Sequence, residues 1–489
     1  MIGQAALPTP QIVLEPILPE LFLVGFAIIG LLYEALARRA EPIVHLTIGL
    51  VGVAFAGAAT IWLWNWDGAA TVLGGSISVD RFSVLARLLL LVVAALGLLL
   101  GDHYFRRSGD EVRGEFTPLV LLATSGMTLI VSAADLVVVF LALEILSLAL
   151  YVLTGLTGRR AANEAAMKYF LLGAFSSAFF LYGIAMAYGA TGTTKIGPMA
   201  LALTGVGGTQ ALALLGFALL AVGFAFKISA APFHMWTPDV YQGAPTPITA
   251  YMSAATKIAA FAALIRVLDV AFQALSWDWT PLVWGLAVVS VVLGSVVAIA
   301  QSNVKRMLAY SSIAHAGFIL TGLVAPGAVG IRAAVFYLVA YAAMTVGAFG
   351  TVMLVSGRGE ERTRLSDYQG LASIHPFAAA FMTLFLLSLA GIPPTAGFIA
   401  KVNVFSAAIG AGYWPLALVG VLISVVAAYF YLRVIVLMYM RDPQDEAAAP
   451  VAAGGVGAVL AVPAAATLIL GIFPGVIVGV IEKASVLRW

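Results

Sequence analysis

The stretch KISAAPFHMWTPDVYQGAPTPITAYMSAATK, residues 227–257, decides how this chain folds. An apolar segment of most of a bilayer width leads into it and ends at Lys227, and a second apolar segment carries Lys257. Asp239 is the only other charged residue between the two lysines. A charged side chain at membrane depth costs about 3 kcal/mol on insertion scales. We therefore predict two membrane helices joined by a loop over residues 232–247, with both lysines on an ion or proton pathway.

The overall composition predicts an all-α polytopic membrane protein. Hydrophobic residues make up 62% of the 489 residues and charged residues only 10%, and the mean hydropathy is +1.05. Soluble globular domains do not reach these values. We expect one integral membrane domain over residues 1–489, in contact with lipid and not with nucleic acid.

Counting about 20 residues for each span, the sequence predicts about fourteen transmembrane helices. In chain order they cover residues 17–37, 43–64, 82–101, 117–132, 135–155, 166–189, the pair around residues 211–227 and 247–268, then 281–300, 307–324, 333–355, 377–409, 415–437 and 456–481.

Two of these helices, the seventh and the twelfth, contain breaks. Pro232 interrupts the seventh, and SLAGIPPTAGF at residues 388–398 interrupts the twelfth through Pro393 and Pro394. Breaks at matching positions of two halves are typical of an inverted-repeat transporter. The alternative for Pro393 and Pro394 is a simple packing kink.

These breaks predict two inverted five-helix repeats within the single domain. The expected divisions are an N-terminal group of three helices at residues 1–114, a first repeat at 115–268 (helices 4–8), a second repeat at 281–440 (helices 9–13), and a C-terminal helix 14 within 450–489.

The basic residues predict the orientation in the membrane. About fourteen Lys and Arg residues lie on one set of alternating loops and about six on the other. Basic loops are enriched on the cytoplasmic side. We therefore expect both termini of this multi-pass protein to lie outside the cytoplasm, which is the periplasmic side if the membrane is the bacterial inner membrane that the resemblance described below implies.

Four ionisable residues are predicted to lie deep in the membrane: Glu144, Lys227, Lys257 and Lys401. Lys257 lies about 16 Å into its helix at 1.5 Å per residue. Glu144 has no local cation and needs a partner on another helix, for which Lys227 is the obvious choice. The alternative is a static ion pair that only packs helices.

Several weaker positions could support proton transfer. The breaks at Pro232, Pro393 and Pro394 free backbone carbonyls, and the polar side chains His234, Tyr241, Tyr310 and His315 could relay protons through water. A lone intramembrane histidine is equally often a hydrogen-bond partner between helices. Arg87 and Lys168 lie near helix ends, where we expect them to extend toward the membrane surface.

The sequence offers no redox or nucleotide chemistry of its own. It has no cysteine, which excludes iron–sulfur ligation, and it shows no Walker loop or dinucleotide fingerprint. No metal-ligand cluster is evident. We expect no cofactor-binding or metal-binding residues in this chain.

Three segments carry a resemblance to a known family. Residues 227–261 closely resemble the subunit N family of bacterial NADH-quinone oxidoreductase (respiratory complex I), an antiporter-like membrane subunit family. EAAMKYFLLGAFSSAFFLYG at residues 164–183 and KRMLAYSSIAHAGF at 305–318 are further matches. Lys401 after GIPPTAGF favours the N type, because the related M type usually carries Glu there.

The resemblance implies a proton-translocating subunit of the membrane arm, coupled to NADH:quinone electron transfer in other subunits. It implies that Glu144 and Lys227 form a modulating pair, that Lys257 is the central proton carrier, and that Lys401 lies on the outlet side. NADH, FMN, iron–sulfur clusters and quinone would be bound by other subunits. The implied partners are other membrane-arm subunits, including further antiporter-like ones.

Two alternatives of other classes remain at this point. One is an Mrp-type cation/proton antiporter subunit, which shares a looser form of the same motif. The other is a structural membrane scaffold whose ionisable residues only pack helices.

Overall fold

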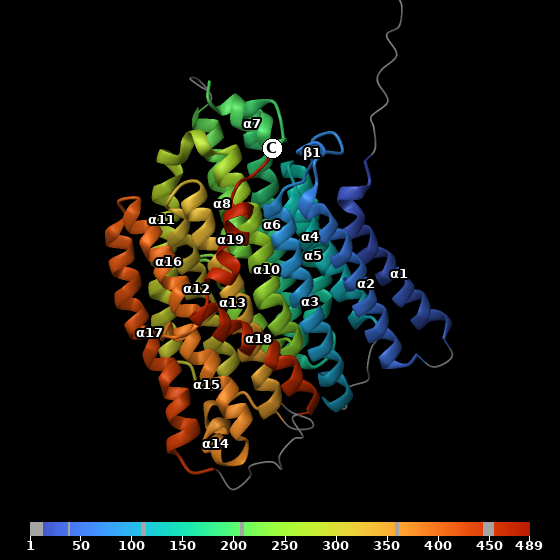
Figure 1. The fold of residues 1–489 in the computed structure, drawn as a ribbon, viewed down its shortest axis with the longest axis vertical. Coiled ribbons are helices and arrows are strands. Elements are labelled where there is room, and N and C mark those ends of the chain that lie inside the picture. Colours follow the sequence, from blue (N-terminus) through green and yellow to red (C-terminus); the bar gives the residue numbers. More distant parts are fainter. Residues whose placement is uncertain (1–12, 38–39, 109–113, 206–209, 357–360, 444–453) are drawn as a thin grey trace, which may run out of the picture.

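The computed structural model describes residues 13–37, 40–108, 114–205, 210–356, 361–443 and 454–489. The described chain is an elongated bundle whose helices mostly follow its long axis (Figure 1). Ten helices in it are long and apolar enough to cross a membrane. The chain is therefore a helical multi-span protein, as the composition predicts.

The first half of the bundle contains ten helices, a short hairpin and three helical turns. The helices are α1 (Leu18–Leu36), α2 (Pro42–Trp62), α3 (Arg81–Ser108), α4 (Phe116–Ser132), α5 (Leu136–Thr154), α6 (Arg160–Thr191), α7 (Ile196–Leu203), α8 (Gln210–Lys227), α9 (Trp236–Gly243) and α10 (Thr246–Arg266). The hairpin pairs β1 (Thr71–Val72) with β2 (Ile77–Ser78) in antiparallel register. The turns are Glu15–Ile17, Leu63–Asn65 and the π-type Val267–Ala271.

The second half contains nine further helices and two short turns. The helices are α11 (Ser276–Ile299), α12 (Val304–Leu323), α13 (Ala328–Val355), α14 (Leu371–Ile374), α15 (Pro376–Ala390), α16 (Ala396–Gly410), α17 (Trp414–Met440), α18 (Gly454–Ile472) and α19 (Gly475–Ala484). The turns are Gln273–Leu275 and Leu365–Tyr368.

The segment predicted as one loop over residues 232–247 is more structured than expected. Residues 236–243 form α9, and α10 already begins at Thr246. Pro238 and Pro247 fall in the first turns of these helices, where backbone N–H groups have no intrahelical acceptor and proline is tolerated. The prediction of a loop was therefore wrong for Pro238 and Pro247, whereas Pro232 and Pro245 do lie outside the helices.

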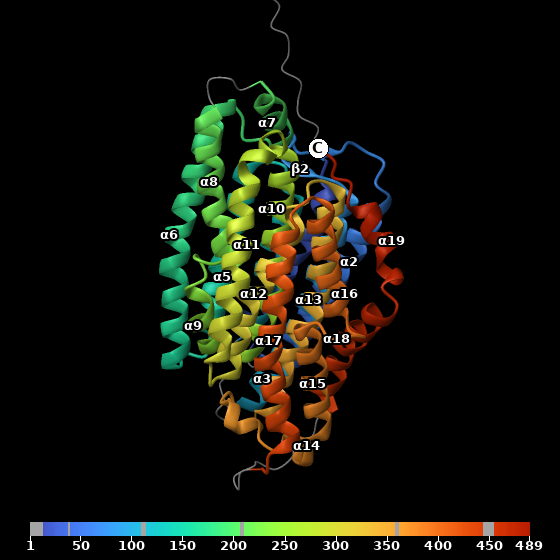
Figure 2. The same ribbon diagram turned by 90° about the vertical axis from the view of Figure 1, so that its left-hand side faces the viewer.

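The predicted last helix, residues 456–481, is also interrupted. Phe473 and Pro474 separate α18 from α19, because proline supplies no backbone donor to continue the helix. The two pieces run obliquely over the bundle and lead back to the C-terminus near α7 (Figures 1 and 2).

Helix α10 lies at the centre of the bundle. Every one of its residues is buried, and it packs against α3, α4 and α13. Helices α6 and α17 instead expose apolar side chains such as Phe175 and Val425, which is the pattern of a lipid-facing surface. A charged residue on α10 is therefore enclosed by protein on all sides.

Close helix contacts depend on small residues. A Cβ at Gly183 of α6 would lie 2.7 Å from the backbone nitrogen of Leu220 in α8, and one at Gly294 of α11 would lie 2.6 Å from that of Ala314 in α12. Small residues let the backbones of membrane helices approach closely. This close packing matters because the hydrophobic effect contributes little to helix association within lipid.

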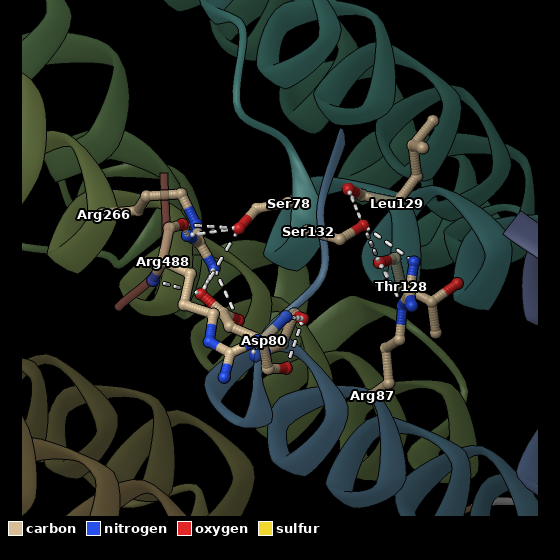
Figure 3. A network of polar contacts seen from close by, with 9 residues as sticks. Ser78, Asp80, Arg87, Thr128, Leu129, Ser132, Arg266 and Arg488 are labelled. Atoms are coloured by element: carbon tan, nitrogen blue, oxygen red, sulfur yellow. Dashed lines mark hydrogen bonds and ion pairs between the residues drawn. The ribbon is translucent and has the colours of Figure 1, made fainter. Parts of the chain in front are cut away.

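Arg87 does not extend toward the membrane surface as predicted. Its side chain is fully buried and pairs with Glu20 of α1 at 3.0 Å. It also donates to Ser132 of α4 at 2.9 Å, on the right of Figure 3. A buried guanidinium is held by a carboxylate and hydrogen bonds when these are present, so it needs no route to water. It attaches α1 to the bundle.

A second buried cluster joins the C-terminus to the centre of the fold. Arg266 at the end of α10 pairs with Asp80 at 3.0 Å. The backbone N–H of Arg488 donates to Asp80 at 3.1 Å, and the Arg488 carbonyl accepts from Ser78 at 2.7 Å (Figure 3). This cluster, Ser78, Asp80, Arg266 and the Arg488 backbone, is called the C-terminal clamp below.

Candidate functional site: a row of buried charges

The four predicted ionisable residues lie on helices α5, α8, α10 and α16. Lys227, Lys257 and Lys401 are at most 5% exposed, whereas Glu144 is half-buried. The broken helices position two of them, because α8 ends at Lys227 and α16 begins five residues before Lys401.

Glu144 and Lys227 are not in direct contact. Ser177 of α6 donates to the Glu144 carboxylate at 2.5 Å, while the Lys227 ammonium donates to Ser147 of α5 at 2.7 Å. No ion pair joins the two charges in the described part of the chain. Ser147 lies about one helical turn after Glu144 on α5, and its own hydroxyl donates to the Leu143 carbonyl, so no described bond links it to Glu144.

Aromatic rings enclose the Lys227 ammonium. The rings of Tyr151, Tyr169 and Phe226 have their centres 5.6–5.7 Å from its Nζ. Ring faces attract cations at this distance. The rings therefore compensate in part for the absence of a direct carboxylate partner.

Lys257 bonds to the first break. Its Nζ donates to the carbonyl of Ile228 at 2.5 Å, immediately after the last residue of α8. The final carbonyls of a helix have no intrahelical donor and carry partial negative charge. The break therefore supplies an uncharged acceptor that favours the ammonium at this depth.

Lys401 makes the corresponding contact at the second break. Its Nζ donates to the carbonyl of Ala390, the last residue of α15, at 2.8 Å, and lies 4.8 Å from the ring centre of Phe318. Gly391 follows with φ of +86°, and a Cβ there would lie 2.8 Å from Cδ of Lys401. Only glycine fits this turn without displacing the lysine.

A hydroxyl and imidazole network lies among α12, α13 and α17. His315 bonds to the hydroxyls of Tyr337 at 2.7 Å and Tyr431 at 3.3 Å, and Tyr341 donates to Ser312 at 2.8 Å. The Tyr341 ring also faces Lys257, with its centre 5.9 Å from Nζ. These groups lie on the elements between Lys257 and Lys401.

The other predicted supporting residues are placed less uniformly. Tyr241 is fully buried in α9. His234 is half-buried in the turn before α9, and Pro232 is exposed at its start. Pro393 and Pro394 form the turn between α15 and α16. Tyr310 is half-buried, and no described hydrogen bond joins it to the His315 network.

Sequence reasoning missed several charges that the fold brings together. Lys305 was counted as a basic loop residue, yet its side chain is fully buried and pairs with Glu361 at 2.8 Å. Asp239 bridges Lys168 at 2.8 Å and Arg306 at 2.5 Å. No local spacing connects these residues, which lie 56 or more positions apart.

Two carboxylates outside the spans are held ionised. Burial raises the pKa of Glu361, but the charge of Lys305 and hydrogen bonds from Lys305 and Thr246 outweigh it and lower the pKa below its ordinary value. Burial likewise raises the pKa of Asp239, and the pairs with Lys168 and Arg306 lower it overall. Both pairs are therefore charged near neutral pH.

Fold and site together define a class: a multi-span helical membrane protein whose interrupted helices hold a row of buried lysines. A family model described as NADH:quinone oxidoreductase/Mrp antiporter, TM, matches residues 133–427. The chain is 44% identical over 478 residues to NADH-quinone oxidoreductase subunit N of Trichlorobacter lovleyi, covering 96% of each chain. It is 43% identical to that of Acidothermus cellulolyticus, covering 98% of this chain and 97% of the relative.

Solved structures agree with these matches. A chain of respiratory complex I from Thermus thermophilus with bound aureothin superposes with a TM-score of 0.80 at 35% identity, covering 95% of this chain and 99% of that one. A chain of the Mrp complex from Dietzia sp. gives 0.82 at 22% identity, covering 97% of each, which shows a shared fold alone. This chain belongs to the NADH-quinone oxidoreductase subunit N family.

Proposed function

We propose that this chain is a proton-translocating, antiporter-like subunit of the membrane arm of NADH:quinone oxidoreductase. It acts as part of a translocase in which other subunits carry out the electron transfer, and it binds no NADH, FMN, iron–sulfur cluster or quinone itself. Its partners are the other membrane-arm subunits and lipid. The observation that carries the proposal is the pair of broken helices with Lys257 and Lys401 each bonded to a freed carbonyl.

We also propose the finer architecture. The chain has about fourteen spans, with residues 115–268 and 281–440 as two inverted repeats of five spans each. The first has α4, α5, α6, the broken α8–α9 and α10, and the second has α11, α12, α13, the broken α15–α16 and α17. The breaks after α8 and after α15 support this division, because in each break a backbone carbonyl accepts a hydrogen bond from a buried lysine. Ten long apolar helices and the shorter apolar segments Phe116–Ser132, Pro376–Ala390 and Ala396–Gly410 are consistent with it.

The proposed roles follow the order of the charges through the bundle. Glu144 and Lys227 form the modulating pair, which is open in this structure: Lys227 donates to Ser147 and Glu144 accepts from Ser177. When they pair, the cation of Lys227 is neutralised and Lys257 holds its proton more easily. When the pair opens, repulsion between Lys227 and Lys257 pushes the proton past His315 toward Lys401; two charges about 7 Å apart repel by a couple of kcal/mol at an effective ε of about 20.

Lys257 is the position that tests this function. Lys257→Met removes the titrating group and keeps an unbranched apolar stem, while Lys257→Arg keeps a charge that does not release its proton. Both variants should lose proton pumping and most NADH-driven quinone reduction in inside-out vesicles, once assembly of the complex is confirmed. A fully pumping Lys257→Met enzyme would overturn the proposal.

The same measurements separate the alternatives. An Mrp-type antiporter subunit would co-purify without flavin and iron–sulfur subunits. A scaffold would assemble and pump normally with Met at position 257. Normal activity of Lys257→Arg beside a dead Lys257→Met would show that charge, and not proton exchange, is needed there.

We propose that both termini lie on the periplasmic side, since the basic loops gather at the opposite end of the bundle. Among the counted basic residues, Arg38, Arg39, Arg113 and Arg358 lie outside the described residues. A reporter that is active only in the periplasm should be active when fused after Trp489. Activity of a cytoplasm-specific reporter at that position, with the complex assembled, would reverse the orientation.

A further inference from the structure

A polar cavity of about 400 Å³ lies where α9 meets α10, at the end of the bundle away from α7 and the C-terminus (Figure 2). This is the end that the basic loops predict to be cytoplasmic. Its charged lining has three carboxylates and two basic side chains: Glu164, Asp239, Glu361, Arg159 and Lys168. Each of these carboxylates lies beside a base: Glu164 and Asp239 pair with Lys168, and Glu361 pairs with Lys305.

The Lys305–Glu361 pair closes the inner side of this cavity. The ammonium of Lys305 donates to the carbonyl of Ala244, at the end of α9, at 2.6 Å and pairs with Glu361 at 2.8 Å. Glu361 in turn accepts from the backbone N–H of Thr246, the first residue of α10, at 2.9 Å. Each charge thus matches the dipole of the helix end it touches, and the pair bridges the junction between the two helices.

Hydroxyls without protein partners lie behind the pair. Thr246 Oγ1 and the Tyr241 hydroxyl are buried, and neither has a hydrogen-bond partner among the described residues. Helix α9, which carries Tyr241, packs against α12, which carries Ser312, and Ser312 accepts from Tyr341. The Tyr341 ring faces Lys257. Buried hydroxyls of this kind are the groups to which water bonds and along which protons pass.

We propose that the Lys305–Glu361 pair gates proton access from this cavity to Lys257, with the Tyr241 hydroxyl as the first relay behind it. The proposal rests on the proposed function, in which Lys257 carries the proton. Glu361 takes one proton from the cavity, which neutralises the carboxylate and frees Lys305 from its partner. Glu361 then passes this proton inward, and each hydroxyl of the relay accepts one proton and releases its own. Neutral Lys257 receives the last proton and becomes an ammonium. Glu361 is again a carboxylate and re-forms the ion pair with Lys305.

The test compares variants of the assembled complex in inside-out vesicles, whose medium faces this cavity. Glu361→Gln keeps an oxygen for the Thr246 N–H but cannot carry the proton. Tyr241→Phe removes only the relay hydroxyl. Tyr251→Phe on α10 is the matched control, because its buried hydroxyl bonds to Thr124, away from the cavity.

Glu361→Gln and Tyr241→Phe should each slow pumping-coupled quinone reduction about tenfold, the effect of about 1.4 kcal/mol on a barrier. Their turnover ratio between H2O and D2O should also rise above that of the wild type, since proton delivery becomes limiting. Tyr251→Phe should change neither. If the Lys305–Glu361 pair is purely structural, its variants would lower the amount of complex but leave the isotope ratio of the assembled enzyme unchanged.

The outcomes separate this proposal from the function beneath it. If assembled Tyr241→Phe has wild-type pumping and a wild-type isotope ratio while Lys257→Met is inactive, the proposed gate is wrong and the proposed function is retained. Normal pumping in Lys257→Met would overturn both. If Glu361→Gln does not assemble, the comparison of Tyr241→Phe with Tyr251→Phe decides.

Discussion

At the scale of single residues, the buried charges are held by neutral groups more than by opposite charges. Lys257 and Lys401 bond to backbone carbonyls, and Lys227 bonds to a serine amid aromatic rings. A fixed buried ion pair strongly stabilises one protonation state, whereas a carbonyl or hydroxyl favours the ammonium less strongly. Neutral partners therefore leave these lysines able to exchange protons.

Ser147 gives a prediction at this scale. Ser147→Ala removes the only described hydrogen bond of the buried Lys227 ammonium, and an unsatisfied buried charge costs more than about 1 kcal/mol. We expect at least a severalfold loss of coupled turnover, with the complex assembled. Ser125→Ala on α4, whose hydroxyl bonds only its own helix, is the control and should be neutral.

The double variant Ser147→Ala/Glu144→Ala adds a second check. If the serine acts by linking the two charges, the double variant should lose little more than Glu144→Ala alone. Fully additive losses would show that Ser147 works independently of Glu144.

At the scale of elements, the two broken helices are the functional parts, because each break frees a carbonyl at membrane depth. Irregular backbone is tolerated there only where protein or a polar cavity satisfies it. In both breaks a lysine from a neighbouring turn or helix supplies the donor. A break and its lysine thus form one unit.

Gly391 and Gly412 test this view as a matched pair. Both have a strongly positive φ, +86° at Gly391 and +89° at Gly412. Ala at either site would therefore cost a similar backbone strain energy of about 1–2 kcal/mol. Only at Gly391 would the added Cβ meet Lys401, while nothing lies within 4 Å at Gly412. We expect Gly391→Ala to lower pumping much more than Gly412→Ala, at similar levels of assembled complex. Equal effects would show that backbone strain alone matters.

At the scale of the whole molecule, buried ion pairs attach peripheral segments to the rest of the bundle. The C-terminal clamp ties the chain end to α10, and Arg87 ties α1 to α3 and α4. Burying apolar side chains between helices stabilises a membrane protein only weakly, because lipid is as apolar as the helices. Polar contacts therefore carry more of the tertiary specificity here than in a soluble protein.

Asp80→Asn tests the clamp. It leaves the Arg266 guanidinium buried and without a carboxylate, which costs about 3–5 kcal/mol when a buried pair is broken. We expect a clearly lower melting temperature of the purified complex. Glu482→Gln breaks the Arg332–Glu482 pair, which is long at 3.9 Å and largely exposed, and should shift melting little. Equal melting of the two variants would contradict a structural role for the clamp.

The sequence alone determined the class of fold, the approximate spans, the two breaks and the four deep ionisable residues. These follow from hydropathy and proline chemistry, which are local along the chain. It did not determine that α9 forms within residues 232–247, since prolines in a first helical turn resemble loop prolines. It also missed that Arg87 and Lys305 are buried and paired, because a charge near a helix end has no local sign of its partner.

Only the tertiary structure decided which groups meet. Glu20 and Arg87 are 67 residues apart, Lys305 and Glu361 56, and Asp80 and Arg266 186. The bond from Lys227 to Ser147 and the carbonyls that hold Lys257 and Lys401 were equally invisible in the sequence. Contacts of this kind depend on how helices pack against one another, and helix packing is set by the shapes of whole faces and not by any local spacing of residues.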